Sequence, residues 1–260
     1  MTFKNIMSAG LTTVMVLALA GCVLTEPRKT QTPENDAVKA QVNLAAALLK
    51  EGAVNQALPE LLKAQKMDPK NANVENLLGL TYYSMKEYDL AITSYHNALK
   101  FDPKRTDVHN NIGLVYLAQQ KYDQALQEFN LCLKDLVYQK KHLPLSNIGL
   151  TYMQMGNYDE ALASLTRATE VAPDYAKSYH HIGQIYKIRE QYNEAADYLG
   201  NAARLSPGDA EIQMDLGDVY AKQNKMEEAA TAYSQAAALA PNTPLALEAQ
   251  KRARKAMGFD

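Results

Sequence analysis

The sequence has no tryptophan, few glycines and no excess of charge of either sign. Its 260 residues include 12 glycines, and 27 lysines and arginines stand against 29 aspartates and glutamates, for a net charge of −2. No basic tail and no long acidic run occurs. Proteins that bind nucleic acid by neutralising phosphates carry a basic surplus in the binding region. The charge balance excludes this class of partner, and we expect no nucleic acid.

Motifs for catalysis and for cofactors are missing too. None of the five histidines stands at metal-ligand spacing from Cys, Asp or Glu. His180 and His181 are adjacent and would point about 100° apart on a helix, so they cannot chelate one ion together. No glycine-rich phosphate loop and no nucleophile elbow occurs. We therefore expect a protein-binding chain rather than an enzyme, with no metal and no cofactor.

The chain opens with an apolar segment. Lys4 supplies a positive charge, and the run from Ile6 to Ala18 is mostly apolar but too short for a comfortable membrane span. Leu19-Ala20-Gly21-Cys22 follows. Residues 1–21 are typical of a signal peptide, and their end with Cys22 resembles the lipobox of bacterial lipoproteins. The alternative is an ordinary secretory signal that happens to contain a cysteine.

The lipobox resemblance implies a lipid anchor. It implies a thioether-linked diacylglycerol on Cys22, cleavage before this residue, and acylation of the new amino terminus. Several acyl chains hold a protein to a membrane more firmly than one. Val23 stands where an aspartate retains enteric-type lipoproteins at the inner membrane, which implies the periplasmic face of the outer membrane. Residues 22–37, rich in proline, threonine and charge, predict a flexible tether with an end-to-end distance of roughly 20 Å.

The rest of the chain repeats every 34 residues. Prolines at 69, 103, 173, 207 and 241 are separated by 34, 70, 34 and 34 residues, and the 70 is one 34 plus one 36. Five repeats also have a glycine, a tyrosine three residues later, an alanine nine further on, and then a large apolar and a small residue, whereas the first repeat is degenerate, with Ala45 in place of the glycine and Leu48 in place of the tyrosine. The glycines are Gly79, Gly113, Gly149, Gly183 and Gly217, and the large apolar residues are Tyr95, Phe129, Leu165, Leu199 and Tyr233.

This pattern resembles the tetratricopeptide repeat, most clearly in LLGLTYYSMKEYDLAITSYHNALKFDP and NIGLTYMQMGNYDEALASLTRATEVAP. The resemblance implies an all-α, right-handed superhelical solenoid of antiparallel helix pairs, which stack to bury apolar faces that no single pair can bury. The tyrosines are then core residues, and the thiol of Cys132, in a small-residue position, is predicted to be buried and inert. Six repeats are predicted at residues 38–71, 72–105, 106–141, 142–175, 176–209 and 210–243, followed by a capping helix and tail at 244–260.

In this family the first helix of each pair lines a concave groove. Mapped here, the groove is apolar with an asparagine fringe over four repeats and polar over the last two, which suits an extended strand or an amphipathic helix of a partner. The alternative is that some of these side chains contact the neighbouring repeat instead. Lys39, Lys177 and Lys187 are too spread out to predict a clamp for a terminal carboxylate. The predicted binding residues are Val42, Leu49, Asn76, Leu80, Tyr83, Asn110, Leu114, Leu117, Leu150 and Met153.

The repeat number, the tether and the lengthened third repeat with Tyr138 resemble the pilotins of type IV pili. That resemblance implies a lipid-anchored monomer that binds secretin subunits of the pilus and helps them reach the outer membrane and form multimers. The alternative is a tetratricopeptide lipoprotein that acts as an adaptor for cell-wall hydrolases or for another envelope complex. Such adaptors tend to dimerise, and the chain shows no extra helical segment for a dimer interface beyond its cap.

Overall fold

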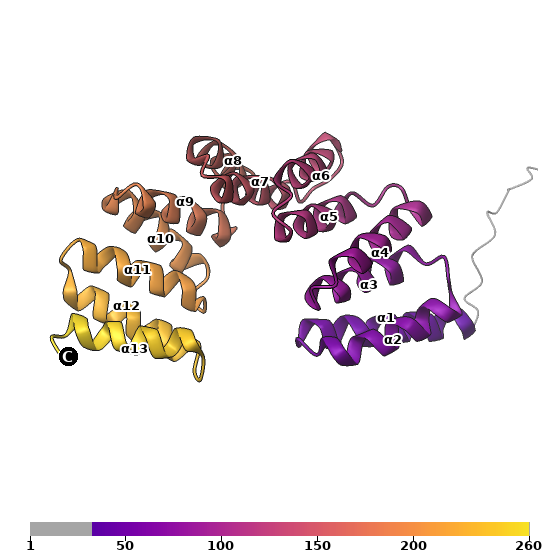
Figure 1. Ribbon diagram of the computed structural model, residues 1–260, viewed down its shortest axis with the longest axis horizontal. Coiled ribbons are helices and arrows are strands. Elements are labelled where there is room, and N and C mark those ends of the chain that lie inside the picture. Colours follow the sequence, from indigo (N-terminus) through magenta and orange to yellow (C-terminus); the bar gives the residue numbers. More distant parts are fainter. Residues whose placement is uncertain (1–32, 260) are drawn as a thin grey trace, which may run out of the picture.

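The computed structural model describes residues 33–259, and over this range the chain forms thirteen α-helices and no strand (Figure 1). The expected all-α solenoid is confirmed: each repeat supplies an odd-numbered and then an even-numbered helix, and α13 follows. The odd-numbered helices are α1 (Pro33–Lys50), α3 (Ala72–Ser84), α5 (Thr106–Ala118), α7 (His142–Met155), α9 (Ala176–Ile188), α11 (Ala210–Lys222) and α13 (Pro244–Ala256). The even-numbered helices are α2 (Val54–Met67), α4 (Tyr88–Phe101), α6 (Tyr122–Lys134), α8 (Tyr158–Val171), α10 (Tyr192–Leu205) and α12 (Met226–Leu239).

Proline sets the end of most even-numbered helices. Helix α2 ends two residues before Pro69, and α10 ends two residues before Pro207. The residue before a proline is disfavoured in helical backbone, so the helix stops there. The third repeat has no such proline. There α6 ends at Lys134, and a connection of residues 135–141 leads to α7.

The first helix is longer than the sequence predicts. We expected the tether to extend to residue 37, but α1 begins at Pro33, so the last residues of that segment are helical. Proline is favoured in the first turn of a helix because its fixed φ suits the helix and its missing N–H has no partner there anyway. Further along α1, Val38, Val42 and Ala45 are buried in a core shared with α2 and α3.

The repeated glycine allows each helix pair to close. In α5, a Cβ placed on Gly113 would come within 2.5 Å of the Phe129 ring of α6. The same relation holds in the other pairs, where the large apolar residue of the even-numbered helix lies over the glycine of the odd-numbered one. These pairs are Gly79 with Tyr95, Gly149 with Leu165, Gly183 with Leu199, and Gly217 with Tyr233.

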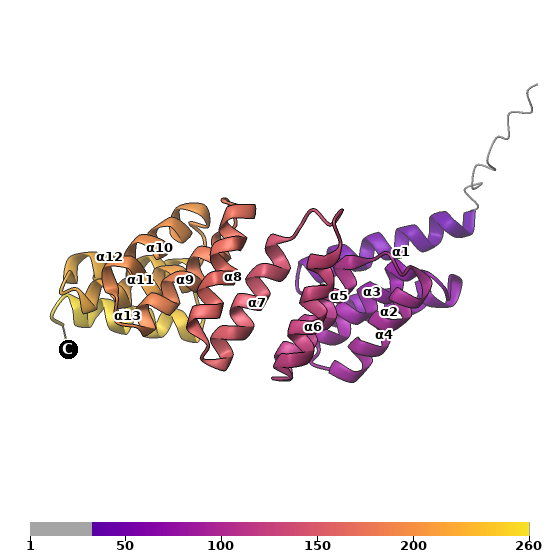
Figure 2. The ribbon, with the colours of Figure 1, turned by 90° about the horizontal axis from the view of Figure 1, so that it is seen from above.

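The stack is curved, with the odd-numbered helices on its inner face. Helix α1 contacts α3, and the same holds for each following odd-numbered pair as far as α9 with α11. The substantial contacts of each even-numbered helix are with the helices just before and after it in the chain. The pairs follow an arch with α6 and α8 on its outer side (Figure 1), and the arch is elongated when seen from above (Figure 2).

Candidate functional site

The ten predicted groove residues all lie on odd-numbered helices, from α1 to α7. Their exposure differs widely. Leu80 is 37% exposed, whereas Val42, Asn76 and Asn110 are each 8% exposed and Leu117 is 5% exposed. The remaining five are half-buried, namely Leu49, Tyr83, Leu114, Leu150 and Met153.

The two asparagines connect neighbouring repeats. The side-chain amide of Asn111 donates a hydrogen bond to Asn76 Oδ1 at 3.0 Å, and that of Asn147 donates to Asn110 Oδ1 at 2.9 Å. These bonds join α3 to α5 and α5 to α7. The amides therefore form contacts between helices, where the sequence interpretation placed them at the fringe of a partner site.

Two apolar groove residues belong to the core as well. Val42 packs with the buried residues of α1, α2 and α3, and Leu117 packs with Phe129 and Ile148. The accessible part of the predicted groove is then Leu80 with the five half-buried residues. This surface runs along the four odd-numbered helices α1, α3, α5 and α7. Their apolar side chains are held in place by the packed helices, so a partner helix or strand could dock against them.

The inner face changes character at α9 and α11. His180 Nε2 lies 2.7 Å from Asp215 Oδ2, Gln184 donates to the same carboxylate at 2.9 Å, and Lys187 forms an ion pair with it. Burial by itself would raise the pKa of Asp215, but the hydrogen bonds from His180, Lys187 and Gln184 outweigh it and lower the pKa to about 2. Asp215 is therefore ionised at neutral pH and ties α9 to α11.

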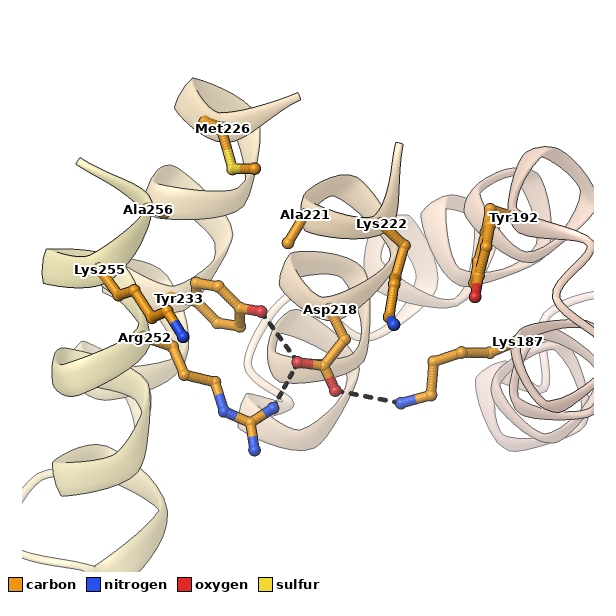
Figure 3. A pocket seen from close by; sticks show the side chains of 10 residues that line it. All are labelled: Lys187, Tyr192, Asp218, Ala221, Lys222, Met226, Tyr233, Arg252, Lys255 and Ala256. Atoms are coloured by element: carbon orange, nitrogen blue, oxygen red, sulfur yellow. Dashed lines mark hydrogen bonds and ion pairs between the residues drawn. The ribbon is translucent and has the colours of Figure 1, made fainter. Parts of the chain in front are cut away.

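A cavity of about 620 Å³ opens beside this network, bordered by α9 to α13 (Figure 3). Asp218 stands at its centre and accepts a hydrogen bond from the Tyr233 hydroxyl at 2.9 Å. Lys187 Nζ lies 3.3 Å from Asp218 Oδ2, and Arg252 of α13 forms an ion pair with the same carboxylate. The capping helix is thus tied by charge to the inner face of the last repeats.

The sequence indicated Lys187 on the groove but not the other basic residues of this cavity. Lys222 and Lys255 line it together with Lys187 and Arg252, and within the described side chains neither Lys222 nor Lys255 pairs with a carboxylate. The basic character of residues 250–255 was visible in the sequence. However, α13 lies outside the repeat, so the repeat positions that locate the groove could not place these residues on it.

The prediction for Cys132 is confirmed. Its side chain is fully buried, and Sγ lies 3.3 Å from the carbonyl oxygen of Thr106. Burial, followed by the nearby charge of Glu128, raises the pKa of the thiol to about 12. The thiol therefore stays protonated and unreactive at physiological pH. The other cysteine, Cys22, lies outside the described residues, as do the predicted signal peptide and most of the tether.

Residues 33–259 provide no cluster of three or more His, Cys, Asp or Glu side chains suited to a metal ion. In the same range, none of the helices has the length and apolar character needed to span a bilayer.

Comparison with protein families gives three matches, all to tetratricopeptide repeats. One model, described as TPR repeat, matches residues 79–120, and two described as tetratricopeptide repeat match residues 141–206 and 182–244. Together these matches cover more than half of the chain. Comparison with curated protein sequences gives no match.

Several solved structures share the fold. PilF of Pseudomonas aeruginosa is 22% identical with a TM-score of 0.67, over 85% of this chain and 99% of its own. PilW, described as a widely conserved type IV pilus biogenesis factor, is 19% identical with a TM-score of 0.69, over 82% of this chain and 98% of its own. Yeast Tom70 is 19% identical with a TM-score of 0.71, over 85% of this chain but 47% of its own.

Proposed function

We propose, from the premise that this chain is a tetratricopeptide-repeat protein, that it is a lipid-anchored scaffold for type IV pilus biogenesis. In this role its concave face holds secretin subunits while they reach the outer membrane and assemble into a multimer. The protein acts by binding rather than by catalysis. Its anchor is the acylated Cys22, and it works as a monomer on the periplasmic face of the outer membrane.

The observation that carries the proposal is the extent of the match to PilF and PilW. Each of these chains is covered almost completely, at 99% and 98%, whereas the equally similar Tom70 is covered over less than half of its length. The likeness to PilF and PilW therefore extends to the size of the whole solenoid. The lipobox-like segment that ends in Cys22 supports the same role, because it would place the solenoid at a membrane.

The concave face offers a physical reason for such a role. A secretin that assembles by strand pairing exposes apolar segments before assembly, and these are prone to aggregate. Partly exposed apolar residues on α3, α5 and α7, such as Leu80, Leu114 and Met153, provide a surface that can cover one of these segments. The groove would release the secretin segment when a neighbouring secretin subunit pairs with it and covers its apolar side chains.

The test is the amount of heat-resistant secretin multimer in outer-membrane fractions. Wild type is compared with a deletion of the gene and with Cys22→Ser, which cannot be acylated. We expect the deletion to lose multimers and to leave secretin monomers in other fractions. We expect Cys22→Ser to show the same loss, because the unanchored scaffold no longer delivers its cargo to the membrane.

Unchanged multimers in the deletion strain would contradict the proposal. Altered cell shape or cell-wall turnover in that strain would instead indicate an adaptor for cell-wall hydrolases. Loss of multimers in the deletion but not in Cys22→Ser would keep the secretin role and remove the lipid anchor from it.

A further inference from the structure

The connection between α6 and α7 presents two aliphatic side chains to solvent. Leu136 is 88% exposed and Val137 is 82% exposed, more than any other large apolar side chain in residues 36–259. The other connections between repeats are short and polar, as in Asp-Pro-Lys-Asn at residues 68–71. An exposed apolar pair at this position has no role in the packing of the solenoid.

Neighbouring contacts hold this connection in a defined shape. The Asp135 carboxylate accepts a hydrogen bond from the backbone N–H of Val137 at 3.0 Å and another from the Thr106 hydroxyl. A side chain that bonds the backbone two residues on forms a compact turn, here with Leu136 at its tip. Tyr138 is half-buried, and the His142 ring packs against the Tyr175 ring in a tilted arrangement, with 4.9 Å between the ring centroids. The turn therefore keeps the aliphatic pair directed outward.

The surroundings of the pair are basic. Lys104 and Lys140 line the same surface hollow as Val137, Lys134 comes just before the connection, and Lys141 is its last residue. Within the described side chains, none of these four lysines forms an ion pair. The two carboxylates that line this hollow are already occupied, since Asp107 pairs with Arg105 at 2.6 Å and Asp135 bonds within the turn. Exposed aliphatic residues and tyrosine among unpaired lysines match the chemistry of an anionic lipid surface.

The position of the connection suits the same partner. It lies on the upper edge of the molecule in Figure 2, the edge at which α1 begins. Pro33 follows Cys22 by eleven residues, a segment that spans at most about 40 Å when fully extended. An anchor at Cys22 would therefore keep this edge of the solenoid near the membrane.

We propose that residues 135–141 contact an anionic membrane surface, with Leu136 and Val137 among the acyl chains and the lysines at the headgroups. The inference rests on the proposed lipid anchor, because two side chains alone give only weak, reversible partition into a bilayer, and the tether raises their occupancy at the surface. One flexible anchor leaves the solenoid free to turn. A second contact fixes its orientation and with it the direction in which the concave face opens.

The absence of tryptophan from the chain allows a direct test. Val137→Trp introduces a single indole at the proposed contact, and the acylated protein is reconstituted in vesicles of phosphatidylcholine and phosphatidylglycerol. We expect its emission to shift to shorter wavelength and to be quenched by doxyl-labelled acyl chains. The matched control is Leu247→Trp on α13, where the native side chain is 71% exposed, and we expect neither change there.

A second measurement separates this inference from the anchor itself. In the unacylated Cys22→Ser protein, the double substitution Leu136→Ser with Val137→Ser should lower partition into anionic vesicles by about tenfold, as expected for two partly buried aliphatic side chains. If the wild-type protein proved not to be acylated, the proposed anchor would be wrong, but the expected difference in partition between these two unacylated proteins would remain. Equal partition of the two proteins would overturn the loop contact.

Two results of the fluorescence test would also overturn the proposal. One is quenching of equal strength at positions 137 and 247, which indicates contact without a preferred face. The other is tryptophan emission at position 137 that does not change when vesicles are added but does change when secretin is added. That result would assign the connection to the protein partner.

Discussion

At the scale of single residues, the repeated position requires glycine because a large side chain of the paired helix lies directly against it. Gly113 faces the Phe129 ring, and an added Cβ would meet three ring carbons at 2.5 to 2.9 Å. Gly200 lies in the interior of α10, and a Cβ added there would have no neighbour within 4 Å. Both glycines are helical, so their backbones are equivalent and only their surroundings differ.

Alanine substitutions at these two glycines should therefore have opposite effects. Gly113→Ala should lower the free energy of unfolding by about 1–3 kcal/mol, because the large ring must move out of a packed core. Gly200→Ala should raise it by about 0.5–1 kcal/mol, because alanine restricts the unfolded chain and favours helix. Urea unfolding followed by circular dichroism measures both, and effects of equal sign would contradict the packing described for the glycine.

The buried thiol gives a second prediction at this scale. The pKa of Cys132 is raised to about 12, so native Cys22→Ser protein should not react with a thiol reagent at pH 8. Unfolding in urea exposes the side chain, and one equivalent of thiol should then react. Cys132→Ala in the same background is the control and should remove that signal. Rapid labelling of the native protein would show that the third repeat opens locally.

At the scale of elements, polar side chains join several of the odd-numbered helices to the next. Asn76 bonds Asn111 between α3 and α5, and Asn110 bonds Asn147 between α5 and α7. Between α9 and α11 the corresponding contact is that of His180 with Asp215, to which Lys187 adds an ion pair. A neutral hydrogen bond contributes about 0.5–1.5 kcal/mol, and bonds to a charged group contribute more. The link between α9 and α11 should therefore be the strongest of the three.

Asp215→Asn tests this link through its pH dependence. The folded pKa of about 2 lies below the usual unfolded value near 3.9, so the carboxylate stabilises the fold above pH ~4 and loses this effect as pH falls through ~2. We expect the substitution to lower the free energy of unfolding at pH 7 by about 2 kcal/mol. The difference from wild type should shrink between pH 4 and pH 2.

The control for that measurement is Asp159→Asn. Asp159 pairs with Arg189 at 2.6 Å, but its side chain is 87% exposed. Exposed ion pairs contribute about 0–1 kcal/mol, so this change should have little effect at any pH. If Asp215→Asn lowered the free energy of unfolding equally at every pH, the carboxylate would act through its shape rather than its charge.

At the scale of the whole molecule, the inner face has two chemically different ends. Over α1 to α7 it presents apolar side chains, and at α9 to α13 it holds a cavity lined by lysines, Arg252 and Asp218. A partner segment that lies along the arch would meet apolar contacts first and charged ones last. This polarity gives an elongated ligand one preferred direction.

Leu80→Glu should weaken the binding of the proposed secretin partner by about tenfold or more, because a charge would be buried in the apolar part of the interface. The matched control is Leu90→Glu on α4, an even-numbered helix, where the native side chain is 48% exposed compared with 37% for Leu80. Both variants should keep the wild-type unfolding temperature. Pull-down of the secretin with purified variants measures the effect, and equal losses at both positions would move the binding surface off the concave face.

The local pattern of the sequence was sufficient to predict the solenoid. Proline, glycine, tyrosine and small residues recur within each 34-residue unit, and each acts on neighbours in its own helix pair, so position in the repeat already determines the contact. The burial of Cys132 followed for the same reason. The start of α1 did not follow, because the segment before residue 38 has no repeat pattern to indicate a helix.

Only the tertiary structure decided how the repeats are linked and where charge gathers. That Asn76 and Asn110 bond to the next helix depends on the rotation between successive repeats, which periodicity alone does not fix. Lys187 and Arg252 meet at Asp218 although 65 residues separate them, because stacking brings the cap against the last inner helices. The outward pair at Leu136 and Val137 depends on a turn that Thr106, in another helix, helps to hold. Contacts within a repeat are local and can be read from spacing, whereas contacts between repeats depend on how the units are oriented.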